Sequence, residues 1–247
     1  MRRSRRAFDL VREIAGHAGI REAWLDALAV LAPTSCTGCG APDRALCDAC
    51  RMLLSTTPHP VELGQPTARS PLVVWSALDY SGVPRSILLA FKDGARTDAA
   101  PALARPLRSA LAAALATVPA HSAVRLAVIP STRAAFRRRG YHPVELVLAA
   151  AGLKTEHPLS VARQTADQAG LGSAARAENR AGSLCARREL RGKTYLIIDD
   201  ILTTGATLLE ARRAIEAAGG VVRGAVTIAH TRRRSAQTGA QEDLRRA

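Results

Sequence analysis

Residues 196–207 place two carboxylates and a hydroxyl-rich turn directly after an apolar run. Asp199 and Asp200 are adjacent, and three threonines surround Gly205 a few positions later. Carboxylates accept hydrogen bonds from hydroxyl groups and bind divalent cations, whereas exposed backbone amides suit an anion. The alternative is an ordinary helix cap with acidic residues beside it. The complete order of strand, Asp-Asp, Thr-Thr-Gly-x-Thr and helix favours a ligand with both vicinal hydroxyls and a phosphate.

The turn in this stretch is predicted to open a helix over residues 207–218, which Gly219 and Gly220 end. The first amides of a helix lack intrahelical partners and carry the positive end of the helix dipole. They therefore form a cradle for a phosphate dianion. The predicted phosphate site consists of Thr203, Thr204, Gly205, Ala206 and Thr207.

Four of the five cysteines lie within fifteen residues as two C-x-x-C pairs, Cys36 with Cys39 and Cys47 with Cys50. Paired knuckles of this spacing let four thiolates converge tetrahedrally on one zinc ion, at a closed and structural site. Disulfides would be the interpretation for an exported protein, and a redox role is open to either pair alone. Cys185 stands apart, and we expect a small core residue there rather than a reactive thiol.

The pattern of apolar residues and turn signals predicts an alternation of strands and helices. Such alternation is typical of an α/β fold with a doubly wound, mainly parallel sheet, which binds ligands at the carboxyl ends of its strands. The predicted strands are 71–80, 125–129, 159–162, 194–198 and 221–229, and the predicted helices are 83–91, 98–118, 143–151 and 207–218.

Composition divides the chain into four parts. Residues 1–34 read as an amphipathic helical extension, and residues 35–70 as the small N-terminal zinc-binding module followed by a linker rich in proline and glycine. Residues 71–232 hold the α/β domain, and we expect the basic tail 233–247 to be disordered.

The net charge of +14 favours polyanionic or phosphorylated partners, although a genome rich in arginine codons would produce the same excess. The chain has no uncharged apolar run long enough to span a membrane. The N-terminal Ser4-Arg5-Arg6 resembles a twin-arginine signal, but charged residues such as Asp9 and Arg12 interrupt the apolar region that export needs. We therefore expect a cytoplasmic protein.

The run from Leu196 to Thr207 resembles the phosphoribosyl pyrophosphate signature of type I phosphoribosyltransferases at every position. Other motifs are similar, in the same order, to the ComF/GntX-like group, and the resemblance covers roughly residues 22–231. These motifs are the four cysteines, Phe91-Lys92-Asp93-Gly94, Ile129-Pro130 with Arg138-Arg139-Gly140-Tyr141, Arg163 with Gln168, and Arg176 with Asn179.

The resemblance implies that Asp199 and Asp200 are catalytic, that Mg²⁺ accompanies phosphoribosyl pyrophosphate, and that the threonine turn holds its 5′-phosphate. It implies pyrophosphate contacts from Ser131, Thr132, Arg133 and Arg139, a mobile loop carrying Arg163, Gln168, Arg176 and Asn179, and a site role for Lys92. The chain departs from the group at His142-Pro143, where an Asn-Gln pair is usual, which puts a polar contact there in doubt.

Two functions remain open at this stage. One is transfer of phosphoribose to an acceptor base that the sequence does not specify. The other is a ComF-type role in competence, DNA uptake or repair, with single-stranded DNA as partner and the pocket regulatory or vestigial. A structural zinc protein with a relic pocket is a third alternative. Trp75 and Tyr80 could stack on a base, but aromatic residues in strands are more often core. The sequence does not encode a readable oligomeric state.

Overall fold

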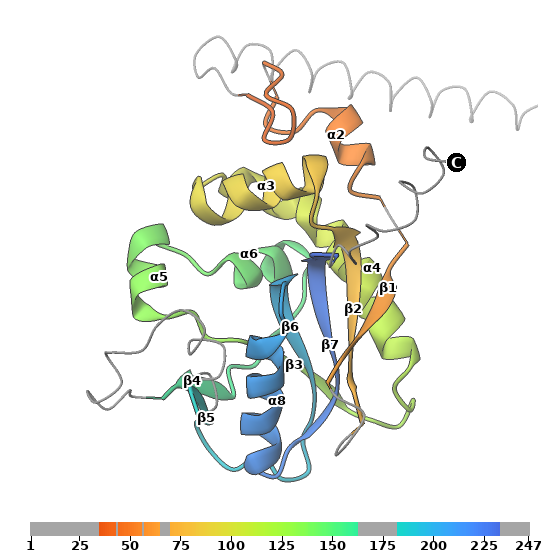
Figure 1. Cartoon of the computed structure of the whole chain (residues 1–247), viewed down its shortest axis with the longest axis vertical. Coiled ribbons are helices and arrows are strands. Elements are labelled where there is room, and N and C mark those ends of the chain that lie inside the picture. The colour runs from red at the N-terminus through yellow and green to blue at the C-terminus, as the bar shows by residue number, and fades with distance from the viewer. Residues whose placement is uncertain (1–34, 43, 56, 65–69, 163–181, 233–247) are drawn as a thin grey trace, which may run out of the picture.

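The computed structural model describes residues 35–42, 44–55, 57–64, 70–162 and 182–232 (Figure 1). Its strands are β1 (His59–Leu63), β2 (Leu72–Asp79), β3 (Val124–Val128), β4 (Leu159–Val161), β5 (Leu184–Ala186), β6 (Thr194–Leu202) and β7 (Val221–His230). Five of them form the central sheet in the order β1-β2-β7-β6-β3, and β4 pairs with β5 in a separate small sheet. The fold is therefore mixed α/β with a mainly parallel centre, as the sequence predicts.

The helices connect these strands and cover the sheet. They are α2 (Asp48–Met52), α3 (Gly82–Asp93), α4 (Ala100–Ala116), α5 (Arg133–Arg139), α6 (Pro143–Ala150) and α8 (Ala206–Ala217), with a short 3₁₀ turn at Thr97–Ala99. Helix α4 illustrates why they form: it is rich in alanine and leucine, and it buries Leu103, Leu107, Ala110 and Ala114 along one face.

Strands β2, β7, β6 and β3 pair in parallel, so their carboxyl ends meet at one edge of the sheet. His230 at the end of β7 lies opposite Asp79 of β2 and Leu202 of β6. Strand β1 pairs antiparallel with β2, and its first residue His59 therefore lies toward the same edge. This carboxyl edge is where α/β sheets bind ligands.

Helices lie on both faces of the sheet. Ile198 and Val226 pack with α3, α4 and α6 in one apolar cluster, whereas their neighbours Ile197 and Ala225 pack with α8 in a second cluster. Successive side chains of a strand point to opposite faces, so this division follows from the backbone. Trp75 packs against the first cluster, as expected of a core aromatic. The doubly wound arrangement is confirmed.

Three sequence predictions need correction. The linker assigned to residues 56–70 contains β1, whose Pro60 is tolerated because an edge strand leaves one side of its backbone unpaired. The strand near 159–162 exists, but it belongs to the small sheet instead of the central one. Strand β6 does not break at Asp199, since it continues to Leu202.

The predicted extension 1–34, the tail 233–247 and most of the predicted loop 163–183 lie outside the described residues. Within the described part of the chain, no helix combines the length and apolar character needed to cross a bilayer.

Candidate functional site

The two adjacent carboxylates lie inside β6, near its carboxyl end. The amide of Asp200 donates to Asp199 Oδ1 at 2.9 Å, and the amide of Ile201 donates to Asp200 Oδ1 at 2.8 Å. The two carboxylates also interact with each other, because the negative charge of Asp200 acts on Asp199. The pair therefore forms one acidic site at the carboxyl end of β6.

Asp200 is held by an ion pair from α3. Lys92 Nζ lies 2.6 Å from Asp200 Oδ2, and the two side chains are 29% and 12% exposed. A pair this sheltered is weakly screened, and removing one partner leaves the other charge partly buried. The motif residue Lys92 thus lies directly at the acidic pair.

Among the described residues, no cation forms an ion pair with Asp199, although the charge of nearby Lys92 acts to lower its pKa. Burial, followed by the negative charge of Asp200, outweighs this effect and raises the pKa of Asp199 to about 7. A carboxyl group with this pKa is poised to ionise when a cation or a hydroxyl donor arrives. The site therefore favours a ligand that brings positive charge or donors to the carboxyl end of β6.

The predicted phosphate turn follows β6 and opens α8. Gly205 adopts a left-handed conformation with φ of 78°, and α8 begins at the next residue. A Cβ at Gly205 would overlap the end of the Leu63 side chain of β1, which would have to move. Glycine is therefore favoured for its backbone angle and for the close approach of Leu63. Thr203 and Thr204 are exposed, and Thr204 Oγ1 accepts from the Ala206 amide at 3.4 Å.

The residues expected near pyrophosphate follow β3, which neighbours β6. Thr132 caps α5 by accepting from the Ala135 amide at 3.2 Å, so its hydroxyl already has a structural role. Ser131 is half-buried and Arg133 is exposed. The helix α5 between Arg133 and Arg139 was not predicted.

The far end of α5 docks onto the end of α3. Arg138 Nη2 lies 2.9 Å and Arg139 Nε 3.6 Å from Asp93 Oδ1, and the Tyr141 hydroxyl donates to the Phe91 carbonyl. Asp93 follows Lys92 in sequence. The structure therefore brings Arg139, Lys92 and Asp200 into one neighbourhood, with Arg139 only 12% exposed.

The departure from the related group lies beside this neighbourhood. His142 stacks on Phe136, with ring centroids 4.7 Å apart and planes at 23°. Pro143 occupies the first turn of α6, a position where its missing amide is harmless. An aromatic stack and a helix start thus stand where an Asn-Gln pair is usual.

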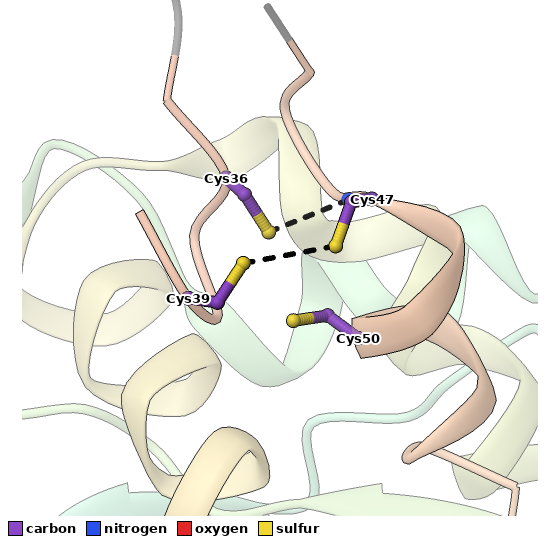
Figure 2. A group of neighbouring side chains, drawn as sticks. All are labelled: Cys36, Cys39, Cys47 and Cys50. Carbon is purple, nitrogen blue, oxygen red and sulfur yellow. Dashed lines mark hydrogen bonds between the residues drawn. The ribbon is translucent and has the colours of Figure 1, made fainter. Parts of the chain in front are cut away.

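The four cysteines converge as their spacing predicts (Figure 2). Cys39 Sγ and Cys47 Sγ are 3.7 Å apart, and all four sulfurs lie within 4.8 Å of one another. Sulfurs bound to one zinc ion at about 2.3 Å are separated by about 3.8 Å. All four are free thiols, so this group could hold zinc.

The pKa values of Cys36 and Cys50 are shifted in opposite directions. Burial opposes ionisation of Cys36, but hydrogen bonds from the amides of Cys47, Cys39 and Gly38 outweigh it and lower its pKa to about 6. Burial and the neighbouring cysteines raise the pKa of Cys50. The Cys36 thiolate is thus stabilised by backbone amides, whereas ionisation of Cys50 requires a bound cation.

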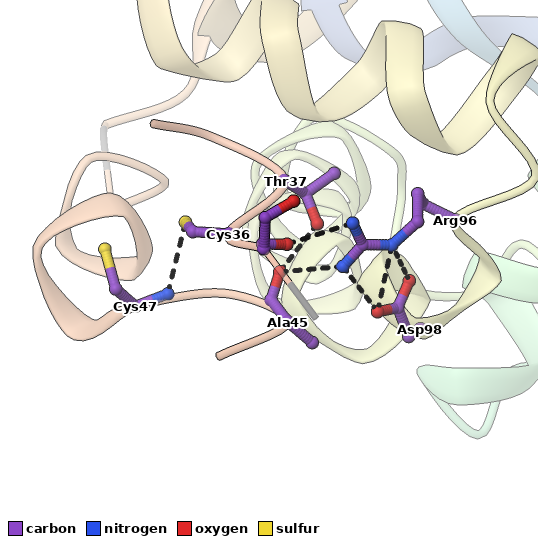
Figure 3. Close-up of polar contacts among 7 residues, drawn as sticks. Cys36, Thr37, Ala45, Cys47, Arg96 and Asp98 are labelled. Atoms are coloured by element: carbon purple, nitrogen blue, oxygen red, sulfur yellow. Dashed lines mark hydrogen bonds and ion pairs between the residues drawn. The ribbon is translucent and has the colours of Figure 1, made fainter. Parts of the chain in front are cut away.

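Arg96 joins the cysteine cluster to the α/β body, which the sequence did not predict (Figure 3). Its guanidinium donates to the carbonyls of Ser35 at 3.0 Å and Ala45 at 3.4 Å, while Asp98 holds it from the other side at 2.9 Å. Thr37 also donates to the Ala45 carbonyl through its hydroxyl at 2.6 Å. The cluster is therefore fixed next to the chain that follows Lys92.

Five further residues complete the comparison with the sequence. Arg163, Gln168, Arg176 and Asn179 lie outside the described residues. Cys185 is exposed, so the expectation of a small core residue is wrong. It lies in β5 between Leu184 and Ala186, which both pack in the second apolar cluster, and strand alternation explains why Cys185 is exposed instead.

Comparison with known proteins identifies the region that carries this site. Residues 135–242 match the family model of the phosphoribosyl transferase domain. The chain is 44% identical over 57 residues to an orotate phosphoribosyltransferase of Methanopyrus kandleri and 45% identical over 49 residues to one of Pyrobaculum islandicum. These segments cover 23% and 20% of this chain and 28% and 25% of the relatives.

Among solved structures, the chain is similar to adenine phosphoribosyltransferases of Leishmania tarentolae and Leishmania donovani. The former has a TM-score of 0.28 at 16% identity, with 74% of each chain covered. The latter has a TM-score of 0.25 at 12% identity, covering 77% of this chain and 87% of the other. Because both TM-scores are low, the fold is assigned from the sheet order and the matched domain. Together those two support the type I phosphoribosyltransferase family.

Proposed function

We propose that this protein binds Mg²⁺ and phosphoribosyl pyrophosphate and transfers the phosphoribosyl group to a nitrogen acceptor. The carrying observation is that β6 delivers Asp199 and Asp200 to the carboxyl edge immediately before the glycine turn that opens α8. An acidic pair a few residues from a helix N-terminus matches a ribose diol joined to a phosphate by one methylene. The phosphoribosyl transferase domain at residues 135–242 supports this use of the site.

In this proposal the acidic pair holds the sugar. Asp200 is paired with Lys92 at 2.6 Å, so a ribose hydroxyl that binds Asp200 must share or displace the ammonium group. A displaced Lys92 lies one residue from Asp93 and its partner Arg139, where it adds positive charge for the pyrophosphate. Asp199 accepts the second hydroxyl beside Asp200, and ligand binding favours its ionised form.

The phosphates occupy two further positions. The 5′-phosphate lies against Thr203–Thr207, where the first amides of α8 and the threonine hydroxyls donate to it. The pyrophosphate lies toward the end of β3, near Ser131, Thr132 and Arg133. The segment with Arg163, Gln168, Arg176 and Asn179 is proposed to close over the reacting sugar.

The reaction is a substitution at the ribose C1 carbon. The bond from C1 to the pyrophosphate oxygen breaks with its electron pair, a nitrogen lone pair forms the new bond to C1, and the acceptor nitrogen loses its proton. Positive charge develops on the sugar, so carboxylates near it and cations near the leaving group lower the barrier. Mg²⁺ supplies charge neutralisation on the pyrophosphate oxygens when bound. Cys36, Cys39, Cys47 and Cys50 would hold structural Zn²⁺, and the four free thiols suit a cytoplasmic location.

Thermal unfolding with and without Mg²⁺-phosphoribosyl pyrophosphate tests the site. At saturating ligand we expect the wild type to gain about 5–10 °C in Tm. Asp199→Asn and Asp200→Asn should each abolish the gain, and Lys92→Met should reduce it. Asp48→Asn, whose side chain is 94% exposed on α2, is the matched control and should behave as wild type. An undiminished gain in both acidic variants would refute the assigned roles.

Pyrophosphate release from a panel of nucleobases tests turnover. Release with at least one base identifies the acceptor class, and it should vanish in Asp200→Asn. Binding without release from any base would leave the ligand as a regulator.

A second candidate is the ComF-type role in competence or DNA uptake, with single-stranded DNA as partner. Helix α5 favours it, because it exposes Arg133, Arg137 and Arg138 on a chain with a net charge of +14. Binding through these arginines should weaken steeply with salt, and replacing all three by glutamine should reduce the salt slope. A flat salt dependence would exclude backbone-phosphate binding by α5.

A further inference from the structure

Three potential metal ligands meet at the carboxyl edge on the β1 side, apart from the cysteine cluster. His59 is the first residue of β1, Asp79 the last of β2 and His230 the last of β7. One ligand atom of each lies within 4.8 Å of the others. Strand register causes this convergence, because Asp79 is paired with His230 across the sheet.

The distances suit a common ion. His59 Nε2 lies 2.9 Å from His230 Nδ1, and His230 Nδ1 lies 3.7 Å from Asp79 Oδ1. Nitrogen and oxygen ligands at about 2.0–2.2 Å from tetrahedral zinc are separated by about 3.3–3.5 Å. The two observed distances bracket that value, so side-chain shifts of a few tenths of an ångström would complete the site.

The contact between the two imidazoles fits either a hydrogen bond or a shared ion. Two ring nitrogens at 2.9 Å cannot face each other with lone pairs alone, so either one of them donates a hydrogen bond to the other, or the rings move apart by a few tenths of an ångström to bind one metal ion. The backbone of Leu78 also accepts a hydrogen bond from the His230 ring, the kind of contact that orients metal-bound imidazoles.

We propose that His59, Asp79 and His230 bind a Zn²⁺ ion with two imidazoles and one carboxylate, leaving a fourth position for water or a ligand atom. Two imidazoles with a carboxylate select zinc and related transition metals over Mg²⁺. The ion joins the consecutive strands β1 and β2 to β7, which is distant in sequence, and fixes β1, the edge strand, to the sheet. The proposal does not depend on the transferase activity.

Arg232 makes the proposal sharper, because it competes for the same carboxylate. Its Nε lies 2.9 Å from Asp79 Oδ1, and its side chain is 72% exposed. The metal must share Asp79 with this guanidinium or displace it toward solvent. Removing the Arg232 charge should therefore strengthen zinc binding at this site by about tenfold. A simple His59–His230 hydrogen bond instead predicts no zinc at this site, with or without Arg232.

Metal content and cobalt spectra of the full chain test the site. Stripped protein re-equilibrated with Zn²⁺ should hold two ions, one for each group of ligands. His59→Gln and Asp79→Asn should each weaken the second ion at least about a hundredfold while the first stays bound. His157→Gln is the matched control, since His157 is exposed and pairs with Glu145 elsewhere. With Co²⁺, the cysteine site gives thiolate charge-transfer bands, and the second ion should add only weak d–d bands.

The outcomes separate clearly. One zinc per wild-type chain, or a second zinc that survives both His59→Gln and Asp79→Asn, overturns the proposal. Loss of both ions in a histidine variant would indicate misfolding, and Arg232→Ala then decides: tighter binding of the second ion than in the wild type supports the site, and unchanged affinity overturns it. Failure of phosphoribosyl pyrophosphate binding would bear on the proposed transferase function alone.

Discussion

The cysteine cluster and the acidic end of β6 are built in opposite ways. All four sulfurs come from fifteen consecutive residues, and amides of the same segment hold Cys36. The acidic end instead depends on contacts across the whole chain, from Lys92 on α3 to Leu63 on β1. A local site can be read from spacing alone, whereas a site assembled by the sheet requires its geometry.

Removing zinc should have the largest effect, because it should destabilise the cysteine cluster without destabilising the central sheet. Structural zinc contributes on the order of 10 kcal/mol to the folding of small zinc modules. We expect Cys36→Ser, or a chelator, to unfold residues 35–54 while the central sheet persists. Hydrogen exchange should accelerate by orders of magnitude in α2 and change little in β6 and β7. Equal acceleration in both regions would mean that the two are one cooperative unit.

Gly205→Ala should produce the next largest effect. Alanine would both adopt φ of 78° and overlap the end of the Leu63 side chain, so we expect a loss of about 2–4 kcal/mol in unfolding free energy. Gly140→Ala is the matched control, because Gly140 has φ of 77° but no atom near its missing Cβ, and about 1 kcal/mol should be lost. Urea unfolding measures both. Equal losses would show that Leu63 yields freely and that only the backbone angle matters.

Asp199 should give stability an unusual dependence on pH. Its folded pKa of about 7 lies above the ordinary value of 3.8, so the folded protein binds a proton that the unfolded chain releases. The stabilisation is complete below about pH 4 and is lost as the pH rises to about 7. The total loss of stability is about 2 kcal/mol after allowance for partial screening. Asp199→Asn should flatten this slope in unfolding curves measured from pH 5 to 8. A slope that persists in the variant would assign the titration to another group.

Arg138→Ala should have the smallest effect. Its ion pair with Asp93 is exposed, with side chains 67% and 49% accessible, so at most about 0.5 kcal/mol should be lost. A loss above 1 kcal/mol in thermal unfolding would show that the docking of α5 on α3 depends on this pair.

The helices and strands with a clear apolar periodicity were predicted from the sequence. Those whose local composition is unusual for a strand were not. Helix α8 and strand β7 were located within a few residues because their apolar patterns are clear. Strand β1 was missed because Pro60 and its neighbours resemble a linker, and the end of β6 was missed because aspartates seldom continue a buried strand.

The candidate site was predicted as a set of residue types but not as an arrangement. Lys92 was found through its motif, yet its ion pair with Asp200 joins residues more than one hundred positions apart. Asp93 belongs to the same motif, but its pairing with Arg138 and Arg139 was not predicted, and Arg96 carried no signal because it is one charged side chain in a polar turn. Such contacts emerge only when the sheet and its helices are folded.

The contact between Leu63 and Gly205 has a consequence for related sequences. Leu63 lies in the edge strand and Gly205 in the turn before α8, and a Cβ at Gly205 would overlap the end of the Leu63 side chain. Among homologues that keep β1, a branched residue at the first position should coincide with glycine at the second. Where an alanine or serine replaces that glycine, a shorter residue should appear in the strand, so the two columns should vary together.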